Sequence, residues 1–234
     1  MSSFQLLVGG LLPYLAVMVF LGGMAYRFYV WFNTPQPGKM TLFPAQEGNT
    51  ARRVIAEALL FPSMFRGDKV LWSFSWLFHA TLALVLLGHV RVFTGLVDRM
   101  LSGMGVSAEG IDTMSSAAGG AAGIVLLATG GLLLARRLVV DRVREISRVA
   151  DFLALLLVIA IVATGNAMRF GAHFDLEQTR TWAASLLRLS PVVPSEGMFL
   201  PHLLLALMLL MYIPFSKILH FGGIFFTQSL VKRR

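Results

Sequence analysis

The sequence predicts an all-α, polytopic membrane protein with five transmembrane helices. Of its 234 residues, 56% are hydrophobic and only 14% are charged, and the mean hydropathy is +0.73. A soluble domain of this length needs a more polar surface. Several apolar runs also exceed the roughly 20 residues that cross the hydrocarbon core of a bilayer. We therefore treat residues 1–234 as a single membrane domain.

The five predicted spans are apolar runs, and the connection between the first two is the longest. No Lys or Arg precedes the first run, which is longer than the apolar region of a cleaved signal peptide, so we expect it to persist as a helix. In the third run, Gly119 and Gly123 lie one turn apart and predict close helix packing. The spans cover about residues 6–32, 71–96, 115–134, 149–170 and 198–221.

The first connection, residues 33–70, contains a predicted amphipathic helix at residues 51–60. Pro35 and Pro37 favour extended chain before it. Two interpretations of this helix remain open. It is either an ordinary connector, or a helix that lies on the membrane surface or supports a partner protein.

The positive charges predict the orientation of the chain. Of its 20 Lys and Arg residues, fifteen fall on one side of the predicted spans, within residues 27–69, 136–148 and 217–234. Because the side richer in Lys and Arg stays in the cytoplasm, we expect the N-terminus outside and the C-terminus in the cytoplasm, in the cell's inner membrane. The net charge of +8 therefore reflects topology and does not indicate nucleic-acid binding.

The chain contains no cysteine. Disulfides, iron–sulfur clusters, thiolate metal sites and covalently attached c-type haem are therefore excluded within it. Any iron–sulfur chemistry that accompanies this protein must belong to a partner.

Four of the five histidines lie within predicted spans, two on the second and two on the fifth. An ionisable ring in the membrane is costly. A lone one is more often hydrogen-bonded to a neighbouring helix than bound to a metal, but two on each of two helices is a different pattern. A haem b takes an axial imidazole on each face, so two facing helices must supply one each. We therefore predict two haem b groups between helices two and five, with their iron bound by His79, His89, His202 and His220.

The predicted topology also determines how these histidines pair. The second span runs outward and the fifth runs inward, so His89 pairs with His202 at the outer side and His79 with His220 at the inner side. The spacings do not match on straight helices, because ten residues rise about 15 Å and eighteen rise about 27 Å. Helix tilt, slanted haems and a bend at Pro214 must absorb the difference.

Basic residues near both predicted haems have two open interpretations. They could pair with haem propionates, or they could be ordinary anchors at the membrane interface. These residues are Arg91 and Arg169 on the outer side, and Arg136, Arg137 and Lys217 on the inner side.

His173, the fifth histidine, follows the fourth span on the outer side. We do not expect it to be an axial ligand, because the four membrane histidines already fill two haems. It is either a solvated loop residue or a proton acceptor at a quinol site that would include Arg91 and Arg169. An unperturbed pKa of about 6.5 suits the second role.

Several short motifs accompany the histidine spacing. They are Trp76-Leu-Phe-His79, Gly88-His89, Ala118-Gly-Gly-Ala-Ala-Gly123, Arg136-Arg-Leu138 and Phe215-Ser-Lys-Ile-Leu-His220. Together they resemble the gamma subunit of respiratory nitrate reductase, a five-helix dihaem cytochrome b, over most of the chain. The long first connection and Leu59-Leu-Phe-Pro-Ser-Met-Phe-Arg66 are similar to the related cytochrome b of the Dsr-type sulfite-reduction membrane complex. The resemblance implies that all four membrane histidines are axial ligands in the pairs given above.

The predicted function is that of a membrane dihaem cytochrome b. It would oxidise a quinol such as menaquinol near the outer haem and pass electrons through the inner haem to a cytoplasmic iron–sulfur partner. As such it would be the electron-transfer subunit of a quinol-dependent oxidoreductase, nitrate-reductase-like or Dsr-type. The alternative is a transporter with histidine proton relays, but the spans hold few carboxylates and no inverted repeat. A scaffold that only anchors a complex would not need buried histidines.

Overall fold

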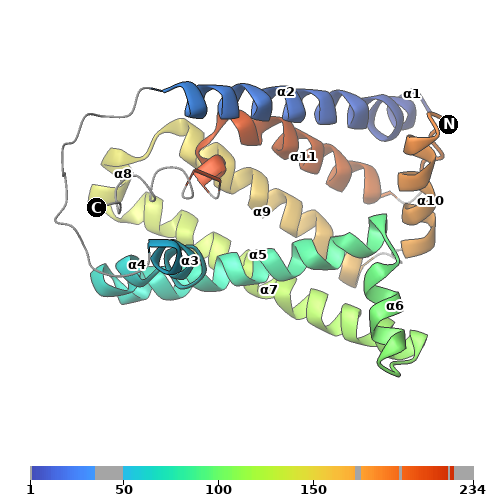
Figure 1. The fold of residues 1–234 in the computed structure, drawn as a ribbon, viewed down its shortest axis with the longest axis horizontal. Coiled ribbons are helices and arrows are strands. Elements are labelled where there is room, and N and C mark those ends of the chain that lie inside the picture. Colours follow the sequence, from blue (N-terminus) through green and yellow to red (C-terminus); the bar gives the residue numbers. More distant parts are fainter. Residues whose placement is uncertain (1, 35–49, 172–174, 195–196, 221, 224–234) are drawn as a thin grey trace.

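The computed structural model describes residues 2–34, 50–171, 175–194, 197–220 and 222–223, and the regular structure within them is entirely helical. This confirms the predicted all-α class. Long helices lie side by side in a bundle, and shorter helices lie at its two ends (Figure 1). We call these the α10 end and the α3 end, after the short helices found there.

Four helical stretches of the described chain are long and apolar enough to cross a membrane. The first is continuous from Ser3 to Asn33 and includes a π-helical turn. Two of the others begin at capped residues: the Asp68 carboxylate accepts a hydrogen bond from the Leu71 N–H, and the Ser107 hydroxyl accepts one from the Gly110 N–H. Their bounds are α1 (Ser3–Gln5), η1 (Leu6–Leu11), α2 (Leu12–Asn33), α5 (Lys69–Phe93), α7 (Ala108–Val139) and α9 (Val149–Phe170).

The fifth predicted span forms a shorter, interrupted helix. Helix α11 covers Phe199–Tyr212 and tightens into the 3₁₀ turn η2 (Ile213–Phe215), so its apolar helix ends at Phe215. Ser216 is then extended, with φ −118° and ψ 171°, before the 3₁₀ turn η3 (Lys217–Leu219). Four described helices, and not five, therefore have the length of a membrane span on their own.

The interruption follows from Pro214 and is held by helix α2. Proline has no N–H to continue the helical ladder. The Arg27 Nε of α2 donates a hydrogen bond of 2.7 Å to the Pro214 carbonyl oxygen. A Cβ atom on Gly23 would lie only 2.6 Å from the Pro214 Cβ, so a glycine is needed for α2 to approach this closely.

The helices pack in a sequence of neighbouring pairs. Helix α5 packs against α7, α7 against α9, α9 against α11, and α11 against α2. At the α7–α9 contact, a Cβ on Gly123 would clash with the Asn166 Oδ1, which is consistent with the close packing expected there. Helices α5 and α11 share no comparable backbone contact within the described chain. A separation therefore remains between α5, which carries His79 and His89, and α11, which carries His202.

At the α10 end, short helices cover the bundle next to a buried apolar cluster. Helix α10 (Leu176–Leu187) is fixed by two long-range hydrogen bonds: the Trp182 indole N–H donates to the Gly9 carbonyl at 2.8 Å, and the Tyr14 hydroxyl donates to the Leu186 carbonyl at 2.7 Å. Helix α6 (Leu96–Gly103) lies at the same end (Figure 1). The buried apolar cluster here consists of Val8, Ala16, Met168, Trp182, Phe199, Leu200, Leu203 and Leu207.

At the α3 end, the predicted amphipathic helix is present as α3 (Thr50–Leu60). Two indole groups of α5 bind its last carbonyls: the Trp72 Nε1 donates to Leu60 at 2.7 Å and the Trp76 Nε1 donates to Leu59 at 3.0 Å. Figure 1 shows α3 nearly end-on, across the direction of α5. The end also contains α4 (Pro62–Gly67) and α8 (Asp141–Ile146).

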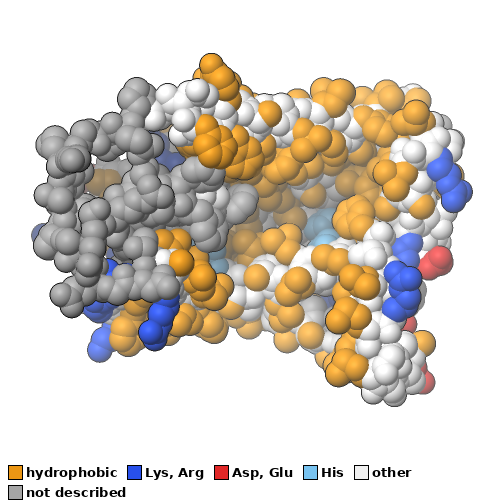
Figure 2. Space-filling view, viewed as in Figure 1, with side chains coloured by type: hydrophobic (Ala, Val, Ile, Leu, Met, Phe, Trp, Pro, Cys, Tyr) orange, Lys and Arg blue, Asp and Glu red, His pale blue; other side chains and the backbone are white. Residues whose placement is uncertain are grey.

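Large apolar side chains cover the flanks of the bundle. Leu15, Met18, Leu21, Leu86 and Leu87 are all more than 45% exposed. Figure 2 shows this apolar surface along the length of the bundle, while basic side chains gather near its ends. A surface of this kind suits hydrocarbon chains as its solvent.

Candidate functional site

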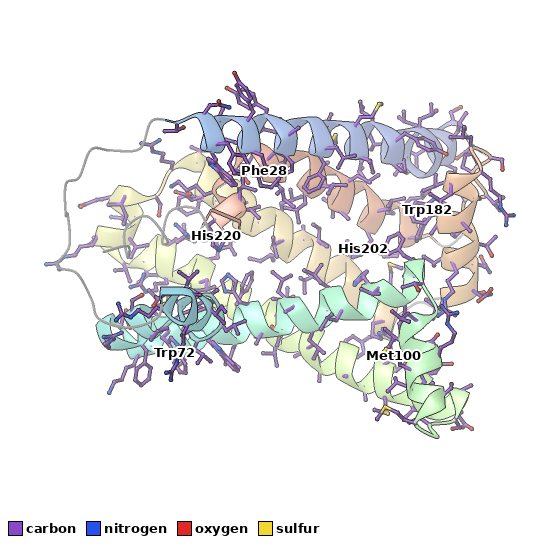
Figure 3. The ribbon with its side chains drawn as sticks, in the orientation of Figure 1. Phe28, Trp72, Met100, Trp182, His202 and His220 are labelled. Carbon is purple, nitrogen blue, oxygen red and sulfur yellow. The ribbon has the colours of Figure 1, made fainter. Side chains whose placement is uncertain are left out.

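The structure brings the four membrane histidines together in two pairs. The ring centroids of His89 and His202 are 6.2 Å apart, and those of His79 and His220 are 5.9 Å apart. These are the partners that the antiparallel topology predicts. His202 and His220 lie at separate positions along the bundle, between the α11 side and α5 (Figure 3). Figure 2 shows histidine side chains inside an apolar hollow between the same two sides.

Each of the four rings donates the hydrogen bond of its Nδ1 to a backbone carbonyl. Because a carbonyl oxygen can only accept, Nδ1 must carry the proton, and Nε2 is left with its free lone pair. No hydrogen bond reaches any of these Nε2 atoms within the described residues. The partners of the Nδ1 atoms are Ser75 O for His79 (2.7 Å), Val85 O for His89 (2.8 Å), Ile161 O for His202 (3.1 Å) and Lys217 O for His220 (2.9 Å).

The planes of the paired rings differ between the two sites. The His89 and His202 rings are nearly parallel, with 17° between their planes. The His79 and His220 rings are nearly perpendicular, at 86°. The two sites are therefore not equivalent in geometry.

Aromatic side chains enclose His79. The Phe61 and Phe78 rings meet the imidazole edge-on, with centroids 5.3 and 5.4 Å away. Phe61 has a left-handed backbone, with φ 50° and ψ 47°, which is rare for a bulky residue. The α3–α4 turn thus places an aromatic ring over the histidine pair nearest the α3 end.

Helix α9 encloses His202. The Thr164 Oγ1 lies 3.0 Å from the His202 Nδ1. A Cβ on Gly165 would lie 3.2 Å from the His202 Cε1, so the imidazole rests directly against the backbone of α9. On the opposite helix, Gly88 next to His89 has open space where a Cβ would be.

The two arginines predicted to lie on the outer side, Arg91 and Arg169, have different partners. Arg91 is 8% exposed, and it donates hydrogen bonds to Asp98 (Nε, 2.6 Å) and Asp112 (Nη2, 2.8 Å). These ion pairs join α5 to α6 and α7. The Arg91 guanidinium, with a contribution from Arg180, lowers the pKa of Asp98 below its ordinary value.

Arg169 lies instead at the α7–α9 contact. Its Nη1 donates to the Ser116 hydroxyl at 3.3 Å, and its Nη2 would lie 3.2 Å from a Cβ on Gly119. His173 lies outside the described residues, so its position relative to Arg169 and Arg91 is untested.

The three basic residues predicted to lie on the inner side each have a protein partner. Arg136 pairs with Asp68 at 3.2 Å, and the Lys217 Nζ pairs with Asp151 at 2.8 Å. The Arg137 Nη1 donates to the Ser147 hydroxyl at 3.0 Å. These contacts join α7 to the start of α5, α7 to the residue after α8, and α9 to the segment before His220.

Sequence reasoning missed Thr164 and Phe61. Thr164 is followed by a glycine in an otherwise apolar helix, which is a local sign that something packs there. No spacing rule indicates which histidine it meets. Phe61 precedes a proline and carries no polar group. Its role is therefore indicated only by its backbone conformation in the structure.

The fold and the site define a helical membrane protein with two facing histidine pairs between antiparallel segments. The model of the nitrate reductase gamma subunit family matches residues 62–233, so the chain belongs to that family. Among its relatives, a cytochrome b-like subunit of an Hdr-like menaquinol oxidoreductase from Archaeoglobus fulgidus is 30% identical over 94% of this chain and 78% of its own length. The corresponding subunit of Archaeoglobus profundus is 26% identical over 93% of this chain and 76% of its own. The nitrate reductase gamma chain of Bacillus subtilis is 26% identical over 96% of both chains.

Proposed function

We propose that this protein is a membrane dihaem cytochrome b that transfers electrons from quinol to a cytoplasmic iron–sulfur partner. The observation that carries the proposal is the pair of facing imidazoles at each of two positions in the bundle. His89 and His202 would hold the iron of the outer haem, and His79 and His220 would hold the iron of the inner haem.

The ring spacing fits an iron atom between each pair. A bond from a metal to an imidazole nitrogen is about 2 Å long, and the nitrogen is about 1 Å from its ring centre, so two rings on one metal have centroids about 6 Å apart. The measured separations are 6.2 and 5.9 Å. Axial ligation requires a ring nitrogen with a free lone pair, and the Nε2 atom of each histidine provides one.

The number of protein ligands also favours haem over a bare metal ion. A protein-bound zinc site, for example, has at least three protein ligands. Within the described residues, no group of three or more His, Cys, Asp or Glu side chains could hold a metal ion. In a six-coordinate haem, two histidines suffice because the porphyrin supplies the other four nitrogens.

Bound there, the two haems would supply one-electron redox chemistry at two depths in the membrane. This chain's own contribution is to hold the imidazoles, fix their tautomers and surround them with apolar side chains. The positive-inside pattern places the His79–His220 pair on the cytoplasmic side, which is where an iron–sulfur partner would dock. The relatives named as menaquinol oxidoreductase subunits support menaquinol as the quinol.

The direct test of the proposal is the haem content of the purified protein. We expect two low-spin b-type haems per chain in its visible spectrum and by pyridine haemochrome quantitation. A protein without haem would contradict the proposal and favour the proton-relay transporter. A single high-spin haem would also contradict it.

For the quinol site we propose the outer side, with Arg169 and His173 as its polar residues. Arg91 is the weaker member of the predicted set, because Asp98 and Asp112 already bind its guanidinium. If His173 accepts a proton from quinol, His173→Ala should leave both haem spectra intact and slow haem reduction by a menaquinol analogue. Stopped-flow spectroscopy measures that rate. Unchanged kinetics would leave His173 a solvated loop residue, and loss of a haem would overturn the ligand assignment.

A further inference from the structure

His202 differs from the other three membrane histidines in the location of the groups that accept the hydrogen bond of its Nδ1. His79, His89 and His220 donate to a carbonyl three or four residues earlier in their own segment. His202 instead contacts helix α9, through Ile161 and Thr164. We propose that Thr164 is a positioning residue that fixes the ring of His202 and raises its basicity as an axial ligand of the outer haem. This inference rests on the haem ligation proposed above.

The hydrogen-bond directions at this contact follow from the neighbouring carbonyls. The His202 Nδ1 is 3.1 Å from the Ile161 carbonyl oxygen, which can only accept, so Nδ1 carries the proton. The Thr164 hydroxyl has its own acceptors in the Ala160 and Ile161 carbonyls, at 3.0 and 2.9 Å. Its oxygen, 3.0 Å from Nδ1, is then free to accept from the imidazole N–H. The ring N–H is thus shared between two oxygens of α9.

The backbone of α9 also limits how the ring can turn. The His202 Cε1 lies where a side chain on Gly165 would otherwise stand, at 3.2 Å from the ideal Cβ position. The imidazole is therefore held by hydrogen bonds on one edge and by close packing next to it. Helix α9, which carries no predicted ligand, sets the orientation of the ring.

This contact has a consequence for the electronic properties of the site. A hydrogen bond accepted from the Nδ1–H raises the electron density on Nε2, and a more basic axial ligand favours the ferric state. The effect is strengthened in the low-dielectric membrane interior. The Thr164 hydroxyl should therefore lower the midpoint potential of the outer haem and leave the inner haem unaffected.

The test compares Thr164→Val with Thr164→Ser in the full-length protein. Valine matches the shape of threonine but has no hydroxyl, whereas serine keeps it. Redox titration of Thr164→Val should show a higher potential for the outer haem alone, and Thr164→Ser should restore the wild-type value. The matched control is Thr129→Val, because Thr129 is 4% exposed and, among the described residues, its hydroxyl bonds to carbonyls of α7 alone. We expect the control to change neither potential.

Every outcome of this experiment bears on the proposal. Equal outer-haem potentials in the valine variant and the wild type would overturn it and leave the two haems standing. If Thr164→Val loses the outer haem, retention of that haem in Thr164→Ser supports the role of the hydroxyl, and its loss there as well overturns it. A wild-type protein without haem would refute the proposed function itself, together with this inference.

Discussion

The tautomer of each histidine determines whether its Nε2 atom is free to bind a metal. A neutral imidazole binds a metal through one nitrogen, and the hydrogen bond on the other nitrogen selects which one. Here the chain directs all four Nδ1 atoms to backbone carbonyls, which side-chain substitutions nearby do not remove. The sequence predicts the histidines as ligands but not this selection, because the tautomer depends on the side-chain rotamers.

Phe61 is the other informative single residue, since its backbone and its side chain have separable roles. A non-glycine residue in the left-handed region costs roughly 1–2 kcal/mol. We expect Phe61→Gly to be more stable than Phe61→Ala by about 1 kcal/mol, because both variants lose the ring but only glycine relieves the strain. Thermal unfolding of the two variants in detergent measures this difference.

The replacement of Ala58 by glycine is the control for this difference in stability. Ala58 lies within helix α3, where glycine is less stable than alanine. Ala58→Gly should therefore destabilise the protein relative to the wild type. If Phe61→Ala proved at least as stable as Phe61→Gly, the left-handed turn over His79 would be wrong.

At the scale of elements, the junction of α5, α6 and α10 depends on one carboxylate. Asp98 of α6 accepts hydrogen bonds from Arg91 of α5 and from Arg180 of α10. Its pKa is lowered from the ordinary 3.8, chiefly by the hydrogen bond from Arg91. A lowered pKa means that the folded state favours the ionised form. The stabilisation is therefore complete above about pH 4 and is lost as the pH falls through the lowered pKa.

We expect Asp98→Asn to reduce the free energy of unfolding at pH 7 by about 1–3 kcal/mol. The difference from the wild type should shrink once the pH falls below 3.8, where the wild-type carboxyl itself becomes neutral. Thermal melts between pH 3 and pH 7 measure both effects. Asp141→Asn is the control, because the Asp141–Arg144 pair is exposed and worth less than about 1 kcal/mol. Equal losses in the two variants at pH 7 would contradict the assigned role of Asp98.

The elements differ in how far the sequence could predict them. The long helices follow from apolar runs of membrane length, and the α3 helix follows from its amphipathic pattern. The break after Tyr212 was expected only as a bend at Pro214. The conformation of this break depends on Arg27 and Gly23 of α2, which lie about 190 residues away in sequence. Such contacts depend on how the helices rotate and pack, which a single sequence does not specify.

Because of this break, the histidine spacing calculated for straight helices does not apply between His202 and His220. Between His202 and His220 the chain is not one helix: it passes through two 3₁₀ turns and the extended Ser216. The eighteen-residue interval therefore does not rise as a single α-helix would. Both histidines of this segment still meet their partners on α5.

At the scale of the whole molecule, the packing order creates the site. Helix α5 packs against α7, α7 against α9, and α9 against α11. Helices α5 and α11 lack backbone contact comparable to these pairs in the described chain. The histidine rings extend into this separation at two positions. We propose that each position holds one haem, with its two ligands coming from opposite sides of the separation.

The most direct test measures which haem is lost when each histidine is replaced by alanine. Parallel and perpendicular imidazole planes give different low-spin ferric spectra, so electron paramagnetic resonance should distinguish the two haems in the wild-type protein. We expect His89→Ala and His202→Ala to lose the same signal, and His79→Ala and His220→Ala to lose the other. If His79→Ala and His202→Ala instead removed the same haem, the pairing of ligands between α5 and the segment from α11 to His220 would be wrong.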